Sequence, residues 1–356
     1  MSSRCRLPNI LCALALGLAA SCVHAPGVGL FGSDDADVSY WEGIDYVDKN
    51  QWYFQRLEDT TCANGTSTGL GVNVGESQRD VVIYLSGGGA CWDDRSCRYF
   101  QTAANLDVIY DSDQLSKELT PLVEAGLFDR DADVNPLPDA SYAYIPYCTA
   151  DLHTGRKTTS YEGFGGGEDI RHHGFYNLQA YLDVLPRYFP NAERVWLIGI
   201  SAGGYGITWN FDHIRAAFPD AEMHVFSDAS PWIPIEDDRW ELWKRNWGLE
   251  TPEGCDDCNS APGYLPAHLA ATYPETRFAM SVFSRDSVLS AYMGVLPGEV
   301  ESAVAEFVEK NYDGDNTRAF VADGAKHETL LELSDGVKSK EGIELSDFLR
   351  QWIAGW

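Results

Sequence analysis

The chain has 356 residues, of which 44% are hydrophobic and 12% aromatic, enough to bury the core of one large α/β domain. With 54 acidic residues against 26 lysines and arginines, its formal charge of −28 repels nucleic acid and anionic membranes at long range, so no nucleic-acid partner is expected. The same charge disfavours a strongly polyanionic substrate unless salt or a local cationic patch offsets the repulsion.

The first 21 residues have the layout of a signal peptide. Arg4 and Arg6 precede an apolar stretch at residues 10–20, which is too short to span a bilayer. The sequence therefore predicts an exported protein.

Cys22 is predicted to become the first residue of the mature chain. Residues 18–22 resemble a lipobox, in which this cysteine is lipidated, and residues 22–39 would form a flexible tether. The alternative is cleavage after Ala25, which Pro26 hinders and which would release a secreted protein. We expect either a lipid anchor in the cell envelope, at the outer membrane or surface, or secretion; a lipid at Cys22 would be the only membrane contact.

Six of the nine cysteines remain once Cys5 and Cys12 leave with the signal and Cys22 is set aside. Six cysteines in an exported chain indicate disulfides, although several pairings are possible. The most economical assignment is Cys91–Cys97, Cys255–Cys258 and, by exclusion, Cys62–Cys148. A structural zinc is not expected, because no second ligand pair stands at a suitable spacing.

A run of three glycines follows the apolar strand predicted at residues 81–85. Three adjacent glycines leave several peptide N–H groups uncovered by side chains, which suits an oxyanion hole. The candidate donors are the N–H groups of Gly88 and Gly89, and a shift of this pair by one residue along the loop is the alternative. A further strand at residues 141–146 and a crossover helix at 175–185 indicate a mostly parallel sheet.

The pattern Gly-x-Ser-x-Gly at residues 199–203 is typical of a nucleophile elbow. An apolar strand precedes Ser201, and helical spacing of apolar residues from Ile207 to Phe218 follows it. The N–H of Ala202 would then be an oxyanion donor. The alternative is a glycine-rich turn that packs tightly or holds a phosphate, but no lysine follows the glycines, which excludes a P-loop.

A serine nucleophile needs a base and an orienting acid, which in this fold follow in the order serine, acid, histidine. Only His327 follows both candidate acids, since His213 and His268 come too early. Asp286 ends the second strand after the elbow, the usual place for the acid. Asp228 ends the first and is a possible supporting residue.

Six segments together resemble the pectin acetylesterase family, which includes plant pectin acetylesterases and animal Notum carboxylesterases. They span residues 84–91, 146–148, 199–204, 227–230, 284–286 and 327–328. The resemblance implies a serine hydrolase of O-acyl esters with Asp286 as the acid, and it favours the Cys62–Cys148 and Cys91–Cys97 pairings. Gly89 departs from the Notum branch, which has tryptophan there, so the long lipid pocket of that branch is not implied.

Taken together, these features predict a single α/β-hydrolase-like domain at residues 40–356, with a mostly parallel central sheet, flanking helices and a cap-like insertion around residues 229–275. The predicted function is ester hydrolysis through an acyl-serine, which removes O-acetyl or other O-acyl groups from a polysaccharide or a small ester. No metal or organic cofactor is expected. The alternatives are a lipase or polyester depolymerase and a non-catalytic surface lipoprotein.

Overall fold

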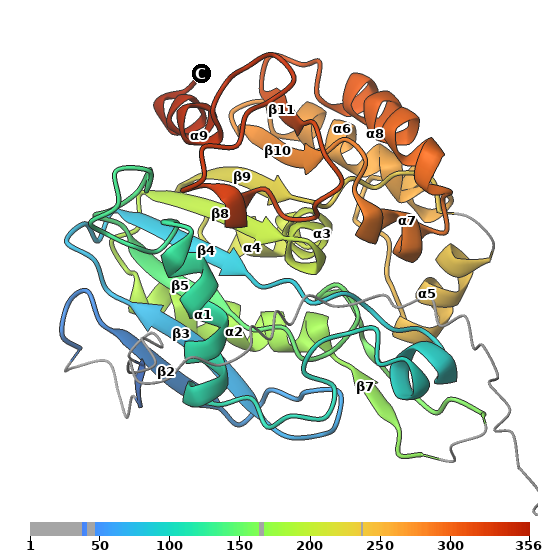
Figure 1. Cartoon of the computed structure of the whole chain (residues 1–356). Coiled ribbons are helices and arrows are strands. Elements are labelled where there is room, and N and C mark those ends of the chain that lie inside the picture. Colours follow the sequence, from blue (N-terminus) through green and yellow to red (C-terminus); the bar gives the residue numbers. More distant parts are fainter. Residues whose placement is uncertain (1–37, 41–46, 164–166, 236–237) are drawn as a thin grey trace, which may run out of the picture. The chain divides into compact units, whose positions relative to one another are not determined.

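The computed structural model describes residues 38–40, 47–163, 167–235 and 238–356 (Figure 1). The predicted signal peptide at residues 1–21, the lipidation site Cys22 and most of the predicted tether lie outside the described residues. The tether prediction was wrong at its end, because Val38 and Ser39 belong to strand β1 and pair with Trp52 and Tyr53 of β2. Sheet pairing therefore begins two residues earlier than expected.

Among the described residues, nine strands form one sheet in the order β1-β2-β3-β5-β4-β8-β9-β10-β11. A separate antiparallel pair, β6-β7, lies outside it. The strands are β1 (Val38–Tyr40), β2 (Trp52–Leu57), β3 (Thr68–Asn73), β4 (Asp80–Leu85), β5 (Ser141–Ile145), β6 (Lys157–Thr159), β7 (Ile170–His172), β8 (Arg194–Ile200), β9 (Glu222–Asp228), β10 (Phe278–Phe283) and β11 (Thr317–Ala322).

The larger part of this sheet is parallel, as predicted. Neighbours from β5 through β4, β8, β9 and β10 to β11 run in the same direction, while β3 is antiparallel to both β2 and β5. In the β4–β8 pair, Leu85 lies opposite Gly199. This register brings the ends of the two strands together, and with them the glycine loop and the elbow.

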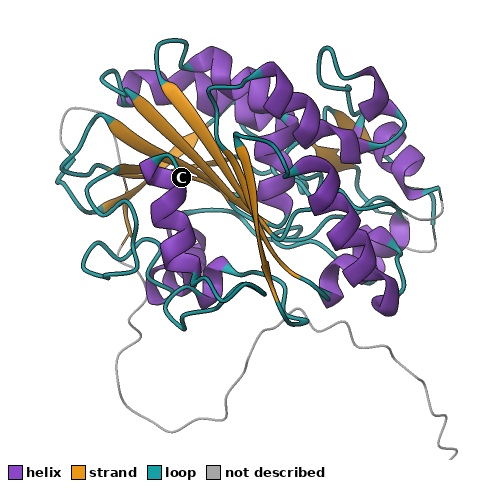
Figure 2. Ribbon diagram, turned by 90° about the horizontal axis from the view of Figure 1, so that it is seen from above, coloured by secondary structure: helices purple, strands orange, loops and turns teal. Residues whose placement is uncertain are grey.

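Helices cover both faces of the twisted sheet (Figure 2). They are α1 (Ser112–Glu124), α2 (Gly174–Tyr188), α3 (Ala202–Trp209), α4 (Phe211–Ala217), α5 (Arg239–Trp247), α6 (Leu265–Thr272), α7 (Ser287–Met293), α8 (Pro297–Asn311) and α9 (Leu345–Ala354), with short helical turns at η1 (Arg95–Tyr99), η2 (Asp256–Asn259), η3 (Pro262–Tyr264) and η4 (Leu330–Glu332). None of the helices in the described part of the chain is long and apolar enough to cross a membrane.

Side chains that alternate along the strands divide the core into two clusters. Ile83 of β4 belongs to the cluster that includes the apolar faces of α2, α3 and α8, whereas the next residue, Tyr84, belongs to the cluster that includes α1 and α9. This alternation is the period-2 pattern of a strand with a layer on each face. The sheet is therefore buried on both sides, and only its edges and strand ends remain for a site.

The helix predicted after the elbow is broken into α3 and α4 at Asn210. The Asn210 side chain donates hydrogen bonds to the carbonyl oxygens of His153 and Gly206, at 3.0 and 2.9 Å. The apolar periodicity continues through this point, so the break was not visible in the sequence.

The segment predicted as a cap-like insertion connects β9 to β10 and contains α5 and α6. Trp247, at the end of α5, donates from Nε1 to the carbonyl oxygen of Cys91 at 2.8 Å, and the ring centroid of Trp243 lies 5.6 Å from that of Trp92. The insertion therefore packs against the residues that directly follow the glycine loop. That it covers the active site stays a prediction.

Candidate active site

Ser201 occupies a strained turn between β8 and α3. Its φ of 51° and ψ of −119° lie in a region that residues with a side chain rarely adopt. A Cβ atom added at Gly199 would lie 2.5 Å from the backbone of Gly203, and one added at Gly203 would lie 1.9 Å from the carbonyl oxygen of Leu85. Both flanking positions therefore require glycine, and the turn presents the serine at the carboxyl end of the strands.

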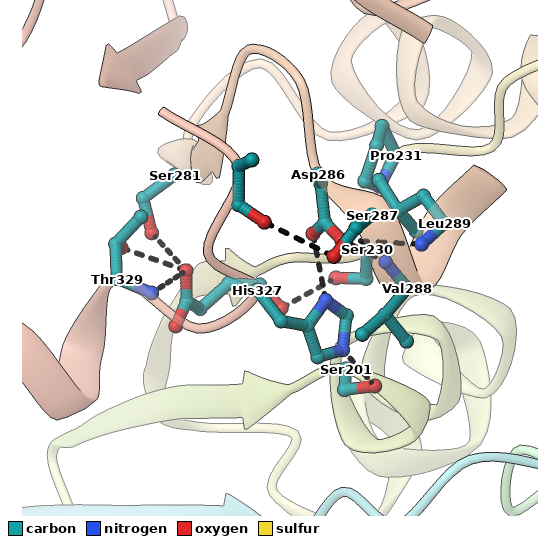
Figure 3. A network of polar contacts seen from close by, with 12 residues as sticks. Ser201, Ser230, Pro231, Ser281, Asp286, Ser287, Val288, Leu289, His327 and Thr329 are labelled. Atoms are coloured by element: carbon teal, nitrogen blue, oxygen red, sulfur yellow. Dashed lines mark hydrogen bonds and ion pairs between the residues drawn. The ribbon is translucent and has the colours of Figure 1, made fainter. Parts of the chain in front are cut away.

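Three side chains from different strand ends meet at this edge (Figure 3). Nε2 of His327, in the loop after β11, lies 2.8 Å from Oγ of Ser201. Nδ1 of the same imidazole lies 2.6 Å from Oδ2 of Asp286, which follows β10. The structure thus brings together the three residues that chain order selected.

Asp286 is fully buried and is the N-cap of α7. Its Oδ1 accepts hydrogen bonds from the N–H groups of Val288 and Leu289, at 2.8 and 3.1 Å. The other oxygen, Oδ2, faces His327, so Nδ1 of the neutral imidazole carries the proton and Nε2 can accept one from Ser201.

The charge around His327 favours its protonated form. Burial alone would lower the pKa of His327, but the hydrogen bond and charge of Asp286, together with the charges of Glu328 and Asp228, raise it to about 8. Burial raises the pKa of the neighbouring Glu328 carboxyl group, and the positive charge of protonated His327 opposes this shift. The imidazole is therefore a stronger base than an isolated histidine, and its neutral form predominates only above this pKa.

Asp228 lies next to these groups but makes no hydrogen bond to His327. Its carboxylate accepts from Oγ of Ser281 at 2.8 Å, from Oγ1 and N–H of Thr329 at 2.7 and 3.1 Å, and from N–H of Leu330 at 2.9 Å. Burial raises the pKa of Asp228, and these donors oppose the shift. The predicted supporting residue thus anchors the loop that carries His327.

The glycine loop after β4 closes directly against the elbow. A Cβ atom added at Gly87 would lie 3.1 Å from Cβ of Ser201, and Gly88 and Gly89 have φ values of +144° and +71°. Space and backbone conformation therefore both require glycine here.

The peptide groups of this loop point in defined directions. The carbonyl oxygen of Gly88 accepts from the N–H of Ala104, and that of Gly89 from the hydroxyl of Tyr147, both at 2.8 Å. The N–H groups of Gly88, Gly89 and Ala202 donate to no acceptor within the described residues. These donors can serve an oxygen atom that is not part of the protein.

All three predicted disulfides are present. They are Cys62–Cys148, Cys91–Cys97 and Cys255–Cys258. Cys91, Cys97 and His172 lie close together, but two sulfur atoms bonded to each other are not the thiolates that bind a metal. The first two disulfides join segments around the glycine loop and so stiffen the surroundings of the site.

Sequence reasoning missed the side chains that hydrogen-bond to the backbone carbonyl groups of the glycine loop. Tyr147 contacts Gly89, and His153 lies 2.9 Å from the carbonyl oxygen of Ser86. Chain order excludes His153 as the base, because it precedes the elbow, and no other pattern distinguishes it from a core histidine. Only the fold brings it to a loop that lies far away in the sequence.

A mostly parallel sheet with a serine at a strand-to-helix elbow, followed along the chain by an acid and a histidine, defines an α/β-hydrolase fold. The sequence profile of the family Pectinacetylesterase matches residues 46–244, more than half of the chain. The chain belongs to this family.

The curated relatives include palmitoleoyl-protein carboxylesterases. Notum2 of Xenopus laevis is 26% identical over 171 residues, which cover 46% of this chain and 32% of the relative. NOTUM of Drosophila melanogaster is 25% identical over 230 residues, which cover 60% of this chain and 32% of the relative. The chain thus matches about a third of the length of these relatives.

Two crystal forms of the Wnt deacylase Notum from Drosophila share the fold. They align with TM-scores of 0.64 and 0.63 at 18% and 21% identity, and each alignment covers 85% of this chain and 92% of the other. At this level of identity the likeness concerns the fold, including its central sheet and flanking helices.

Proposed function

We propose that this protein is a serine carboxylic-ester hydrolase that works through an acyl-serine intermediate. The observation that carries the proposal is the line of contacts from Ser201 Oγ through the His327 imidazole to the Asp286 carboxylate, at 2.8 and 2.6 Å. Such a line matches a nucleophile, a general base and an orienting acid. Membership in the pectinacetylesterase family supports the choice of an ester bond.

In the first step, Oγ of Ser201 attacks the carbonyl carbon of the ester while Nε2 of His327 accepts the hydroxyl proton. Asp286 stabilises the imidazolium that forms. The negative charge on the former carbonyl oxygen is stabilised by the N–H groups of Gly88, Gly89 and Ala202. The intermediate collapses when His327 returns the proton to the alcohol oxygen, which leaves as the free hydroxyl group.

In the second step, water replaces the alcohol. His327 takes a proton from the water molecule as its oxygen attacks the acyl-serine, and then protonates Oγ of Ser201 as the carboxylic acid leaves. No atom from outside the protein, the ester and water is needed for this cycle.

The substrate we propose is an O-acetyl or other O-acyl ester carried by a polysaccharide or a similar molecule. The family name supports an acetylated carbohydrate, whereas the curated relatives are named for palmitoleoyl-protein esters. The formal charge of −28 favours a neutral or weakly charged carrier over a dense polyanion.

The decisive experiment compares the wild-type protein with Ser201→Ala on p-nitrophenyl acetate. We expect kcat to fall by about 10⁶-fold while the circular dichroism spectrum and melting temperature are retained. Ser260→Ala serves as the control, because this exposed serine only donates to the carbonyl oxygen of Asp257 in the insertion. A fluorophosphonate should label the wild-type chain at Ser201 alone. Retained turnover in Ser201→Ala would contradict the proposal.

A series of acetyl, butyryl and longer esters, combined with acetate release from acetylated polysaccharides, tests the substrate. Preference for acetyl esters supports deacetylation. Preference for long chains or polyesters would instead favour the lipase or depolymerase alternative, and no labelling at all would favour a non-catalytic lipoprotein.

We also propose that the chain is exported and lipid-anchored at Cys22. Three disulfides in the described residues suit an oxidising compartment. Metabolic labelling with an alkyne fatty acid should mark the wild-type chain and not Cys22→Ser. Equal labelling of both chains would exclude this anchor, and absence of label from the wild type would favour simple secretion.

A further inference from the structure

A buried histidine lies between the glycine loop and the helix that starts at Ala202. His153 is 3% exposed, and its Nε2 lies 2.9 Å from the carbonyl oxygen of Ser86, the residue before the glycine run. Its own carbonyl oxygen accepts from Nδ2 of Asn210, directly after α3. A Cβ atom added at Gly206, inside α3, would lie 2.9 Å from Cβ of His153. His153 therefore contacts both elements that supply the proposed oxyanion donors.

The protonation state of His153 follows from its partner. A carbonyl oxygen only accepts hydrogen bonds, so Nε2 must carry the proton. Burial lowers the pKa of His153 to about 4, although the hydrogen bond to Ser86 opposes the shift. The imidazole is thus neutral at the pH of catalysis and donates a steady hydrogen bond to the loop.

The backbone around His153 is held in an uncommon conformation. Ala150, Leu152 and His153 have φ values of 59°, 56° and 59°, and all three are buried. Residues with a side chain adopt such values rarely, and they persist only where the surrounding structure enforces them. Here the hydroxyl of Tyr147 accepts from the N–H of Leu152 at 2.8 Å and donates to the carbonyl oxygen of Gly89. The strained segment is thus built directly onto the glycine loop.

Peptide planarity allows these contacts to fix the orientation of both ends of the glycine loop. In a trans peptide the carbonyl oxygen and the N–H point in opposite directions, so a held carbonyl also fixes the next residue's N–H. His153 fixes the Ser86–Gly87 peptide, which carries the N–H of Gly87, and Tyr147 fixes the peptide after Gly89. The two peptides that carry the N–H groups of Gly88 and Gly89 lie between these fixed peptides, and the carbonyl oxygen of Gly88 is held by the N–H of Ala104. Three successive glycines have little conformational preference of their own, so the loop depends on such external contacts.

We propose that His153 is a positioning residue that holds the glycine loop at a fixed orientation and distance from α3, so that the N–H groups of Gly88, Gly89 and Ala202 converge on one oxygen atom. The proposal rests on the proposed function, because it assigns His153 a role only if these groups stabilise an oxyanion. His153 itself touches neither substrate nor Ser201 in this role.

The test uses two substitutions that differ in one donor. His153→Leu keeps an apolar side chain of similar size but cannot donate, whereas His153→Gln places an amide N–H close to the position of Nε2. We expect kcat for p-nitrophenyl acetate to fall by about 10²-fold in His153→Leu, the size of a lost oxyanion donor, with KM nearly unchanged. His153→Gln should recover most of this loss.

A second readout separates positioning from a general structural effect. A trifluoromethyl ketone forms a serine-bound oxyanion, so its affinity should weaken in parallel with kcat/KM across the His153 variants. The matched control is His172→Leu. His172 is also buried, but its nitrogens lie 3.0 Å from the carbonyl oxygen of Thr149 and 2.8 Å from the hydroxyl of Tyr161. This variant should lose thermal stability while its kcat and ketone affinity stay near those of the wild type.

Tyr147→Phe keeps the test decisive if His153→Leu does not fold, because it removes the hydroxyl that binds both the carbonyl oxygen of Gly89 and the N–H of Leu152, next to His153. It should lower kcat with KM retained. The proposal is overturned if folded His153→Leu, or Tyr147→Phe in its place, keeps wild-type kcat and ketone affinity, or if His172→Leu loses both to the same extent. If instead Ser201→Ala retains activity, the proposed function fails on its own account.

Discussion

Thr329 binds Asp228 with both its hydroxyl and its backbone N–H, at 2.7 and 3.1 Å from Oδ1, and so ties the loop of His327 to the end of β9. The carboxylate of Asp286 approaches the same histidine from β10 through Nδ1. Two buried acids at adjacent strand ends therefore have separate tasks. One contacts the imidazole, and the other fixes the backbone that carries it.

We predict that Asp286→Asn and Asp228→Asn affect different quantities. Asp286→Asn should lower kcat on the order of 10⁴-fold at a nearly unchanged melting temperature, because an amide no longer holds the Nδ1–H tautomer or balances the imidazolium. Asp228→Asn should lower the free energy of unfolding by about 2–3 kcal/mol, because its amide group cannot accept from every donor that faces the buried carboxylate. Activity assays and denaturant melts on both variants check this. The reverse pattern would make Asp228 the acid.

The pH dependence of Ser201 labelling should report the protonation of His327. Because Asp286 and its acidic neighbours raise the pKa of His327 to about 8, the neutral base is depleted below that pH. The rate of fluorophosphonate labelling should therefore rise with pH to a plateau, with its midpoint near 8. The contribution of His327 to stability changes with pH in the opposite direction to the labelling rate. Because the pKa of His327 is higher in the folded than in the unfolded chain, this contribution is fully present below the pKa of the unfolded state and is lost as pH rises through about 8.

Glu328→Gln tests the electrostatic origin of this pH dependence of Ser201 labelling. It removes one negative charge that raises the pKa of His327 and leaves the contacts of Ser201 and Asp286 in place. The midpoint of the labelling profile should move to lower pH, with the plateau rate close to that of the wild type. A midpoint that stays unchanged would show that Glu328 does not act on the imidazole.

Much of this site could be predicted, because its residues either stand in a local sequence motif or follow a fixed order along the chain. Ser201 stands in a five-residue motif after an apolar strand, and His327 is selected by chain order alone. The Asp228–Thr329 contact and the position of His153 have no such signal, because each depends on segments that meet only in the fold. The break of the elbow helix at Asn210 is of the same kind, because the Asn210 side chain binds the carbonyl oxygen of His153, a contact that forms only in the fold.

The elbow glycines should be intolerant of even one methyl group. Gly203→Ala places a Cβ atom 1.9 Å from the carbonyl oxygen of Leu85, where only backbone movement could relieve the clash. We expect loss of activity together with a large drop in melting temperature, because β4 and the elbow must separate. Gly298→Ala, in the first turn of α8, is the control, because its Cβ atom would meet nothing within 4 Å. Wild-type stability in Gly203→Ala would contradict the close approach.

The two disulfides near the glycine loop should differ in their contribution to stability. Cys62–Cys148 spans 86 positions and Cys91–Cys97 only 6. The entropy lost by the unfolded chain grows with the closed loop, which corresponds to about 4–5 kcal/mol for the first and about 2 kcal/mol for the second. Paired alanine substitutions, compared in denaturant under oxidising conditions, measure this difference. We expect Cys62→Ala with Cys148→Ala to cost more in unfolding free energy, and the reverse order would mean that local contacts around Cys91 and Cys97 outweigh the chain-entropy effect.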